Sequence, residues 1–224
     1  SRYNLTSPPE AVRSYFRHAT EADFPPRYNI APTQPVAIVR PDHAGVRELV
    51  LVRWGLIPPW VEDPRRFSTL INARSETAAE KPSFRGAMRH KRCLVPADGF
   101  YEWTGAPGHK RPHLIRPKAG GPIALAGLFE HWGGADGSEI ETMAILTVGA
   151  NAAIAAIHDR MPAILAPEAF DAWLDCRGVP AGAAAALLRP APEALLEVVE
   201  VSARLNNPRN EGPDLLTQDR TTLL

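Results

Sequence analysis

The segment from Arg92 to Trp103, RCLVPADGFYEW, places two short apolar runs on either side of an Asp-Gly pair. Aliphatic and aromatic residues favour strands and Asp-Gly favours a turn, so the segment predicts a tight β-turn-β unit. Glu102 interrupts the second run, between Tyr101 and Trp103. Two interpretations of this carboxylate stay open: it faces solvent on the polar side of a strand, or apolar neighbours raise its proton affinity at a functional site.

The chain holds 23 prolines among its 224 residues, twice the usual ~5%. Because proline fixes the backbone and removes a hydrogen-bond donor, this usage favours short elements over a helical bundle. Strand-like segments follow one another at hairpin spacing, at residues 36–40, 48–53, 111–116, 122–129 and 141–148. We therefore expect an α+β fold: a single compact β-rich domain over residues 1–224, with a mainly antiparallel barrel-like sheet and short peripheral helices.

Short helices are predicted where capping residues precede apolar stripes. Ser7-Pro8-Pro9-Glu10 is typical of a helix start, with Ser7 as the N-cap. A basic helix ending near His90 would place Phe84 and Met88 on its inner face.

Composition excludes some classes of function. The formal net charge is zero, so the overall charge of the chain does not indicate a polyanion as its partner. Residues 65–92 nevertheless hold eight Lys or Arg against two Glu, which is either a face for a phosphate backbone or an ordinary solvated surface. Cys93 and Cys176 match no metal-binding spacing, and no apolar run approaches about 18 residues. We expect a cytoplasmic protein of a reducing compartment, without membrane, metal or cofactor.

Several other residues are candidates for a site. RWGLIPPW contains Trp54 and Trp60, which form either a core plug or a base-stacking platform. Asn72 and Arg74 lie two apart on an extended stretch and could hold an anionic or carbonyl ligand on one face; the alternative is a turn with a surface Arg. His158 ends a predicted helix, where the dipole favours its cation, so it suits proton transfer unless it is structural.

Seven segments occur in order between Arg2 and about Leu165, and together they closely resemble the SRAP family, the SOS response-associated peptidase domain. They are RYN, YNIAPTQ, WGLIPPW, INARSET with EKPSF, RCLVPADGFYEW, GLFEHW and IHDRMP. The resemblance implies a compact β-rich domain that acts in the DNA damage response. It also implies a covalent link to abasic sites in single-stranded DNA, made through an N-terminal cysteine that removal of the initiator Met exposes.

The resemblance assigns roles to individual residues. It implies an active-site asparagine at Asn72, a glutamate at Glu102 and a histidine at His158. The phosphate-contacting arginines would be Arg2 and Arg74. Further DNA contacts are expected from Trp54, Trp60, Trp103, Pro32 and Arg85. The partner would be single-stranded DNA containing abasic sites, bound by a monomer associated with the nucleoid.

The family's catalytic cysteine is not in the sequence. Family members begin Met-Cys-Gly-Arg or similar, whereas here Ser1 precedes Arg2, so we expect Met-Cys before Ser1 in the natural protein. The cysteine amine would condense with the aldehyde of an open abasic sugar, and the thiol would close a thiazolidine.

In this chemistry Glu102 would serve as general acid and base, and His158 would assist sugar ring opening and release. Asn72 would orient the terminus. Two alternatives remain: a thiol peptidase that acts on its own N-terminus, or a non-covalent single-stranded DNA-binding module if the cysteine is truly absent. Lyase activity is a separate expectation, in which a Schiff base proceeds to strand cleavage.

Overall fold

Five strands close into a barrel in the computed structural model, which describes residues 1–217. They are β3 (Pro35–Pro41), β4 (Arg47–Trp54), β6 (Arg92–Ala97), β9 (Ile123–Gly133) and β10 (Glu139–Gly149). Around the barrel the order is β10, β4, β3, β6, β9 and back to β10. All of these neighbours are antiparallel except β4 and β10, which run parallel. The predicted β-rich α+β fold with a barrel-like, mainly antiparallel sheet is confirmed.

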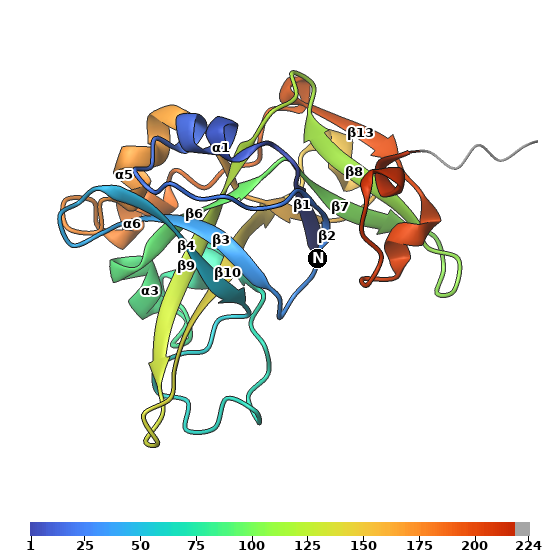
Figure 1. The fold of residues 1–224 in the computed structure, drawn as a ribbon. Helices are drawn as coiled ribbons and strands as arrows, with labels where there is room; N and C mark the ends of the chain where they lie inside the picture. The colour runs from blue at the N-terminus through green and yellow to red at the C-terminus, as the bar shows by residue number, and fades with distance from the viewer. Residues whose placement is uncertain (218–224) are drawn as a thin grey trace, which may run out of the picture.

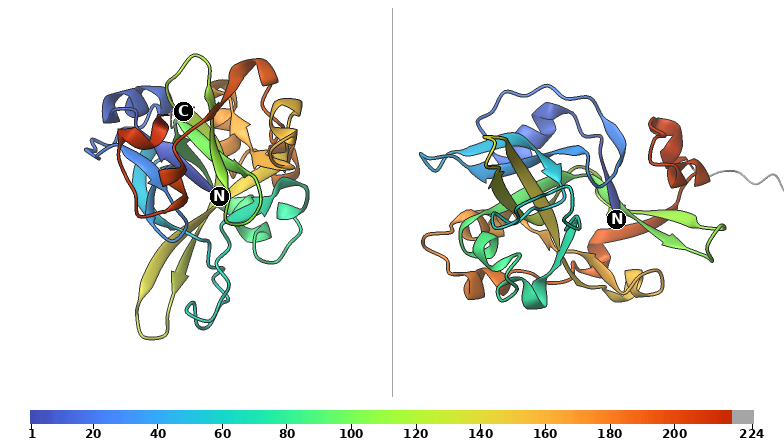
Figure 2. Two further views of the ribbon diagram at one scale, coloured as in Figure 1. Left: turned by 90° about the vertical axis from the view of Figure 1, so that its right-hand side faces the viewer. Right: turned by 90° about the horizontal axis from the view of Figure 1, so that it is seen from below.

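A second sheet lies beside the barrel, to its right in Figure 1, with the order β13, β8, β7, β1, β2 and every pairing antiparallel. Its strands are β1 (Arg2–Leu5), β2 (Arg27–Ile30), β7 (Gly99–Thr104), β8 (Arg111–Pro117) and β13 (Leu196–Glu200). The N-terminus begins β1 and lies between the barrel and the β7–β8 hairpin (Figures 1 and 2).

The predicted tight β-turn-β unit is wrong, because β6 and β7 belong to different sheets. β6 pairs with β3 and β9 in the barrel, whereas β7 pairs with β1 and β8. Asp98 makes the crossing between the sheets: its carboxylate accepts hydrogen bonds from the backbone N–H groups of Thr6 and Ser7, the second at 2.6 Å, and from the Ser7 hydroxyl. The prediction of Ser7 as an N-cap is therefore wrong: Ser7 binds Asp98, and Pro8 occupies the N-cap position of the helix that begins at Pro9.

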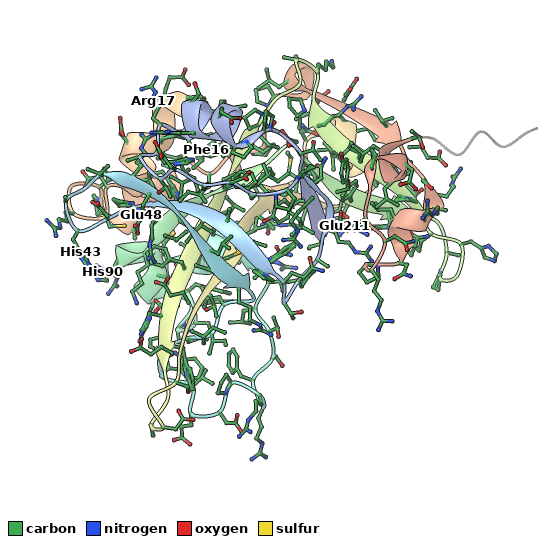
Figure 3. The ribbon with its side chains drawn as sticks, viewed as in Figure 1. Phe16, Arg17, His43, Glu48, His90 and Glu211 are labelled. Carbon is green, nitrogen blue, oxygen red and sulfur yellow. The ribbon has the colours of Figure 1, made fainter. Side chains whose placement is uncertain are left out.

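Short elements cover the barrel. The helices are α1 (Pro9–Phe16), α2 (Ser75–Ala78), α3 (Arg85–His90), α4 (Ala152–Ala155), α5 (Phe170–Leu174) and α6 (Ala181–Ala185). Three further strands, β5 (Asn72–Arg74), β11 (Arg160–Pro162) and β12 (Ile164–Leu165), extend the barrel sheet. Phe16 of α1, labelled in Figure 3, stacks on Phe170 of α5 with the ring centroids 5.7 Å apart. None of the helices within residues 1–217 is long and apolar enough to cross a membrane.

The segment after β13 straps the outer edge of the second sheet. It contains two 3-10 helices, η3 (Ala203–Asn206) and η4 (Pro213–Leu216). Glu211, labelled in Figure 3, accepts hydrogen bonds from the N–H of Tyr28 at 2.8 Å and of Asn29 at 3.3 Å. The buried Asn29 amide donates in turn to three backbone carbonyls of the same segment. These bonds hold the segment against β2, close to the start of the chain.

Candidate active site

A cavity of about 180 Å³ opens where the barrel meets the second sheet. Ser1, Asn72, Glu102 and His158 all line it. The structure therefore brings together the three residues that the sequence marks as candidates, together with the first residue of the chain. They come from three elements that lie far apart in the sequence, namely β5, β7 and the loop after α4.

Strand pairing positions each of these side chains. Arg2 is paired with Tyr101, which brings Ser1 to the neighbourhood of Glu102 on β7. β5 runs parallel to β10 with Asn72 opposite Ile145, and the Asn72 amide donates a hydrogen bond of 2.8 Å to the Ser1 hydroxyl. This hydrogen bond links Asn72 to the first residue of the chain.

Burial changes the proton affinities of two groups in the cavity. Desolvation raises the pKa of Glu102 above its ordinary value; the nearby His158 and the N-terminal amine oppose this rise. Desolvation also lowers the pKa of the Ser1 amino group, against the attraction of Glu102. Both shifts favour the uncharged forms, so a larger fraction of molecules has a neutral amine next to a protonated carboxyl. Such a pair suits the condensation of an amine with a carbonyl compound.

The His158 ring is held through its Nδ1 atom. Nδ1 lies 3.0 Å from the backbone N–H of Arg160, which donates to it. It also lies 3.0 Å from the Arg160 carbonyl oxygen and 3.3 Å from Oδ1 of Asp159. In the neutral ring Nδ1 accepts from the N–H, and in the cation it donates to one of the two oxygens. The backbone of Arg160 therefore holds the ring on its Nδ1 side.

Arg160 is a site residue for which the sequence pattern gave no role. Its guanidinium binds both carboxylate oxygens of Glu76, at 2.7 and 2.9 Å, and the carbonyl oxygen of Thr147 at 2.6 Å. Arg160 and Thr147 both line the cavity. The signal in the sequence was the arginine two positions after His158 in IHDRMP, but its partner Glu76 is 84 residues away.

The predicted phosphate ligands Arg2 and Arg74 lie in different surroundings. The guanidinium of Arg2 donates to the backbone carbonyls of Leu205 and Asn206, the latter at 2.9 Å, and lies 5.1 Å from the ring centre of Trp103. These contacts engage most of its donors with the C-terminal strap. Arg74 is exposed on β5, two residues after Asn72.

Trp103 borders a second, open cavity of about 570 Å³ that adjoins the first and shares Ser1 and Arg2 with it. The indole N–H of Trp103 donates to the Asn206 side chain at 2.7 Å, and the Asn206 amide donates to the carbonyl of Lys110 at 2.9 Å. Asn206 therefore fixes the orientation of the Trp103 ring along the cavity wall.

The other predicted DNA contacts are more scattered. Trp54 is only 1% exposed, packs edge-on against Tyr3 and donates to the carbonyl of Ile71 at 2.9 Å, so it is a core residue beneath the cavity. Trp60 is 58% exposed and lines a separate groove of about 430 Å³ together with Arg85. Pro32 lies in the turn between β2 and β3 and lines neither cavity at the N-terminus.

The two cysteines of the chain do not provide a nucleophile in this cavity. Cys93 is completely buried in the barrel, and desolvation raises its thiol pKa well above the ordinary value. Cys176 borders a different surface groove, beside α5. Within residues 1–217 no group of three or more His, Cys, Asp or Glu side chains could hold a metal ion.

The chain is similar to proteins that are named for abasic sites. It is 40% identical over 197 residues to abasic site processing protein YoqW of Bacillus subtilis (strain 168), which is 88% of each chain. It is 36% identical over 228 aligned positions to abasic site processing protein HMCES of Gallus gallus, covering 88% of this chain and 67% of that protein.

Solved structures share the fold. A protein from Bacteroides thetaiotaomicron superposes with a TM-score of 0.82 at 26% identity, over 97% of this chain and 98% of that one. A protein from Bordetella bronchiseptica superposes with a TM-score of 0.77 at 30% identity, over 90% and 99%. SOS response associated peptidase (SRAP) matches residues 1–208, and on this match and these relatives the chain belongs to the SRAP family.

Proposed function

We propose that the protein processes abasic sites in single-stranded DNA by forming a covalent link through an N-terminal cysteine directly before Ser1. The observation that carries the proposal is the convergence of Ser1, Asn72, Glu102 and His158 on one cavity at the start of the chain. A residue joined to the Ser1 nitrogen would begin in this cavity. The names of the relatives, abasic site processing proteins, support the same substrate.

The chemistry uses the aldehyde of the open abasic sugar. The cysteine amine attacks the aldehyde carbon, and the carbonyl oxygen leaves as water to give an imine. The thiol sulfur then adds to the imine carbon while its proton passes to the nitrogen, which closes a five-membered thiazolidine. The net change is the loss of one water, without any oxidation or reduction. An α-amino group is suited to this attack because its ordinary pKa lies near neutrality, at ~7.7 to 8.

Each side chain of the cavity has a step to assist. Protonated Glu102 supplies the proton that the departing water needs, and its raised pKa keeps that proton available at higher pH. His158 exchanges a proton with the sugar hydroxyl during ring opening, and in the reverse direction during release. Asn72 holds the chain start in place by its hydrogen bond to Ser1.

Two surfaces beside the cavity suit the rest of the strand. The larger cavity combines the ring of Trp103 with the cations Arg2 and Lys110, a combination that fits the base and phosphate of a neighbouring nucleotide. The exposed Arg74 on β5 suits a phosphate on the other side of the abasic residue. The groove of Trp60 and Arg85 would contact the strand further away.

The proposal is tested with the chain preceded by Met-Cys, from which the Met is removed, and with a matched chain preceded by Met-Ala. Each is incubated with single-stranded DNA carrying one abasic site or one tetrahydrofuran site, which lacks the aldehyde. We expect a heat-stable adduct only from the cysteine chain with the abasic site. Equal binding of both DNAs with no adduct would overturn the covalent proposal in favour of a non-covalent binding module.

A further inference from the structure

Glu76 lies at the centre of a network that no step of the proposed chemistry uses. It is the second residue of α2, directly after β5, and its carboxylate binds the Arg160 guanidinium through two hydrogen bonds of 2.7 and 2.9 Å. The Arg160 side chain is 19% exposed and that of Glu76 is 55% exposed. Arg160 lines the cavity, and Glu76, which does not, binds it as the more exposed partner.

The same guanidinium is anchored to the barrel. One of its terminal nitrogens donates to Thr147 on β10, to the carbonyl oxygen at 2.6 Å and to the hydroxyl at 3.2 Å. The remaining donor, Nε, is buried and has no hydrogen-bond partner among the described residues. The backbone of Arg160 is held in β11, where it pairs with Gly149 of β10. Its guanidinium depends on two anchors, Thr147 and Glu76, of which only Glu76 carries a compensating charge.

The backbone of Arg160 is what holds the His158 ring. Its N–H and its carbonyl oxygen both lie 3.0 Å from Nδ1, one as donor and one as acceptor. Because β11 fixes this backbone, the ring stays next to Arg160, whose guanidinium lines the same cavity. The guanidinium charge, if it lost Glu76, would oppose the formation of a cationic ring close by.

We propose that Glu76 is a positioning residue of the active site, which holds the Arg160 guanidinium at the cavity wall, compensates its charge and so supports the cationic form of His158. This inference rests on the proposed function for its kinetic consequence, but the state of the His158 ring can be measured without DNA. Other charged groups face the ring as well: Glu102 from β7, Asp159 beside it and the N-terminal amine. They are unchanged by a substitution at position 76.

The substitutions Glu76→Gln and Glu76→Asp separate charge from shape. Glutamine keeps the length of the side chain and removes its charge, whereas aspartate keeps the charge on a shorter side chain. Glu197→Gln is the matched control, because Glu197 makes a comparable ion pair with Arg116 at 2.7 Å on the second sheet, away from the cavity. Thermal unfolding of each variant checks that the fold is retained.

The first readout is the titration of His158, followed by NMR of the imidazole signals in the protein without DNA and assigned with His158→Gln. We expect Glu76→Gln to move this titration to lower pH, because the uncompensated Arg160 guanidinium opposes a positive charge on the ring. Glu76→Asp should recover most of the wild-type titration, and Glu197→Gln should leave it unchanged. An unchanged His158 titration in Glu76→Gln would overturn the inference.

The second readout is the rate of adduct formation on abasic single-stranded DNA at saturating DNA concentration. We expect Glu76→Gln alone to slow adduct formation about two- to fivefold. In a chain that already carries His158→Gln, adding Glu76→Gln should not slow adduct formation further. An equal slowing in the presence and absence of His158 would show a structural role and contradict the inference. If the wild-type chain with its N-terminal cysteine forms no adduct, the proposed function fails, while the NMR titration still decides the role of Glu76.

Discussion

Glu102→Gln tests the chemical core of the proposal, because it removes one proton from the cavity while keeping nearly the same side-chain volume. General acid and base groups contribute about 10²- to 10⁴-fold to a reaction rate. His158 lines the same cavity and remains able to transfer protons, so the lower end applies. We expect adduct formation to slow about 100-fold, which corresponds to about 2.7 kcal/mol of activation free energy.

The pH dependence of the rate makes this prediction sharper. Formation requires a neutral amine and a protonated Glu102, so the rate should rise and then fall with increasing pH. Burial raises the pKa of Glu102, which increases the fraction of molecules that carry a protonated Glu102 at the optimum. The two limbs belong to the coupled pair and not to either group alone. Glu102→Gln should abolish the descending limb, because the residue that loses its proton there is gone.

The assay is single-turnover adduct formation with the cysteine chain and abasic single-stranded DNA, quantified on denaturing gels between pH 5 and 9. Glu197→Gln is a suitable control, since it also removes a carboxylate but lies in an ion pair with Arg116 on the second sheet, away from the cavity. If Glu102→Gln kept the wild-type rate, or kept a descending limb at the same pH, the assignment of the proton donor would be refuted.

Four further predictions concern the surroundings of this site. The folded-state pKa of Glu102 is raised above its unfolded value, so the ionised carboxylate destabilises the folded protein. Glu102 has no such effect on stability below the ordinary carboxyl range, and the loss of stability grows as pH rises from there through the folded pKa. Glu102→Gln should therefore raise Tm near pH 7 and leave it unchanged near pH 3. Arg74→Ala should weaken binding to single-stranded DNA and reduce the slope of log K against log salt by about 0.7, the value for one phosphate contact on a single strand; an unchanged slope would exclude that contact. Asn206→Ala should release the Trp103 ring and weaken DNA binding several-fold, with little change in the rate of adduct formation at saturating DNA; a rate effect without an affinity effect would place Trp103 in the chemistry instead. Arg92→Met should lower the free energy of unfolding by about 3 kcal/mol or more, because the buried guanidinium donates to four backbone carbonyls that would lose their partners; a fall in denaturant midpoint no larger than that of the exposed Arg89→Met would contradict this.

The sequence predicted the local elements well because their signals are local. Alternating apolar residues and prolines indicated the strands now seen as β3 and β4, and Phe84 and Met88 are buried beside α3 as expected. The convergence of Asn72, Glu102 and His158 was also predicted, although through the family resemblance and not through spacing. Nothing in the sequence distance between residues 72 and 158 indicates that β5 and β11 pair with the same strand, β10.

The long-range pairings could not be read from the sequence. Hairpin spacing predicts that each strand pairs with the next, which fails for β6 and β7 because Asp98 binds the backbone of residues 6 and 7 instead. The barrel is closed by a parallel pairing of β4 with β10, about 90 residues apart, and hairpin spacing has no signal for it.

The two tryptophans of RWGLIPPW show the same limit for side chains. Both are tryptophans in the same short segment, yet Trp54 is buried in the core and Trp60 is exposed. The difference follows from position: Trp54 ends β4 inside the barrel and Trp60 lies in the loop after it. The docking of the segment after β13 against Asn29 of β2 was equally unpredictable, because the hydrogen bonds that hold it go mostly to backbone atoms, which carry no residue signature.

The most direct test of the account is the intact mass of the chain with cysteine before Ser1, before and after incubation with abasic single-stranded DNA. The account predicts one new species with the summed mass of protein and DNA less one water, which survives heating. It also predicts that this species is absent with the tetrahydrofuran site and with alanine in place of the cysteine. No such species with intact abasic DNA, or the same species from the alanine chain at the same rate and heat stability, would contradict covalent capture by an N-terminal cysteine.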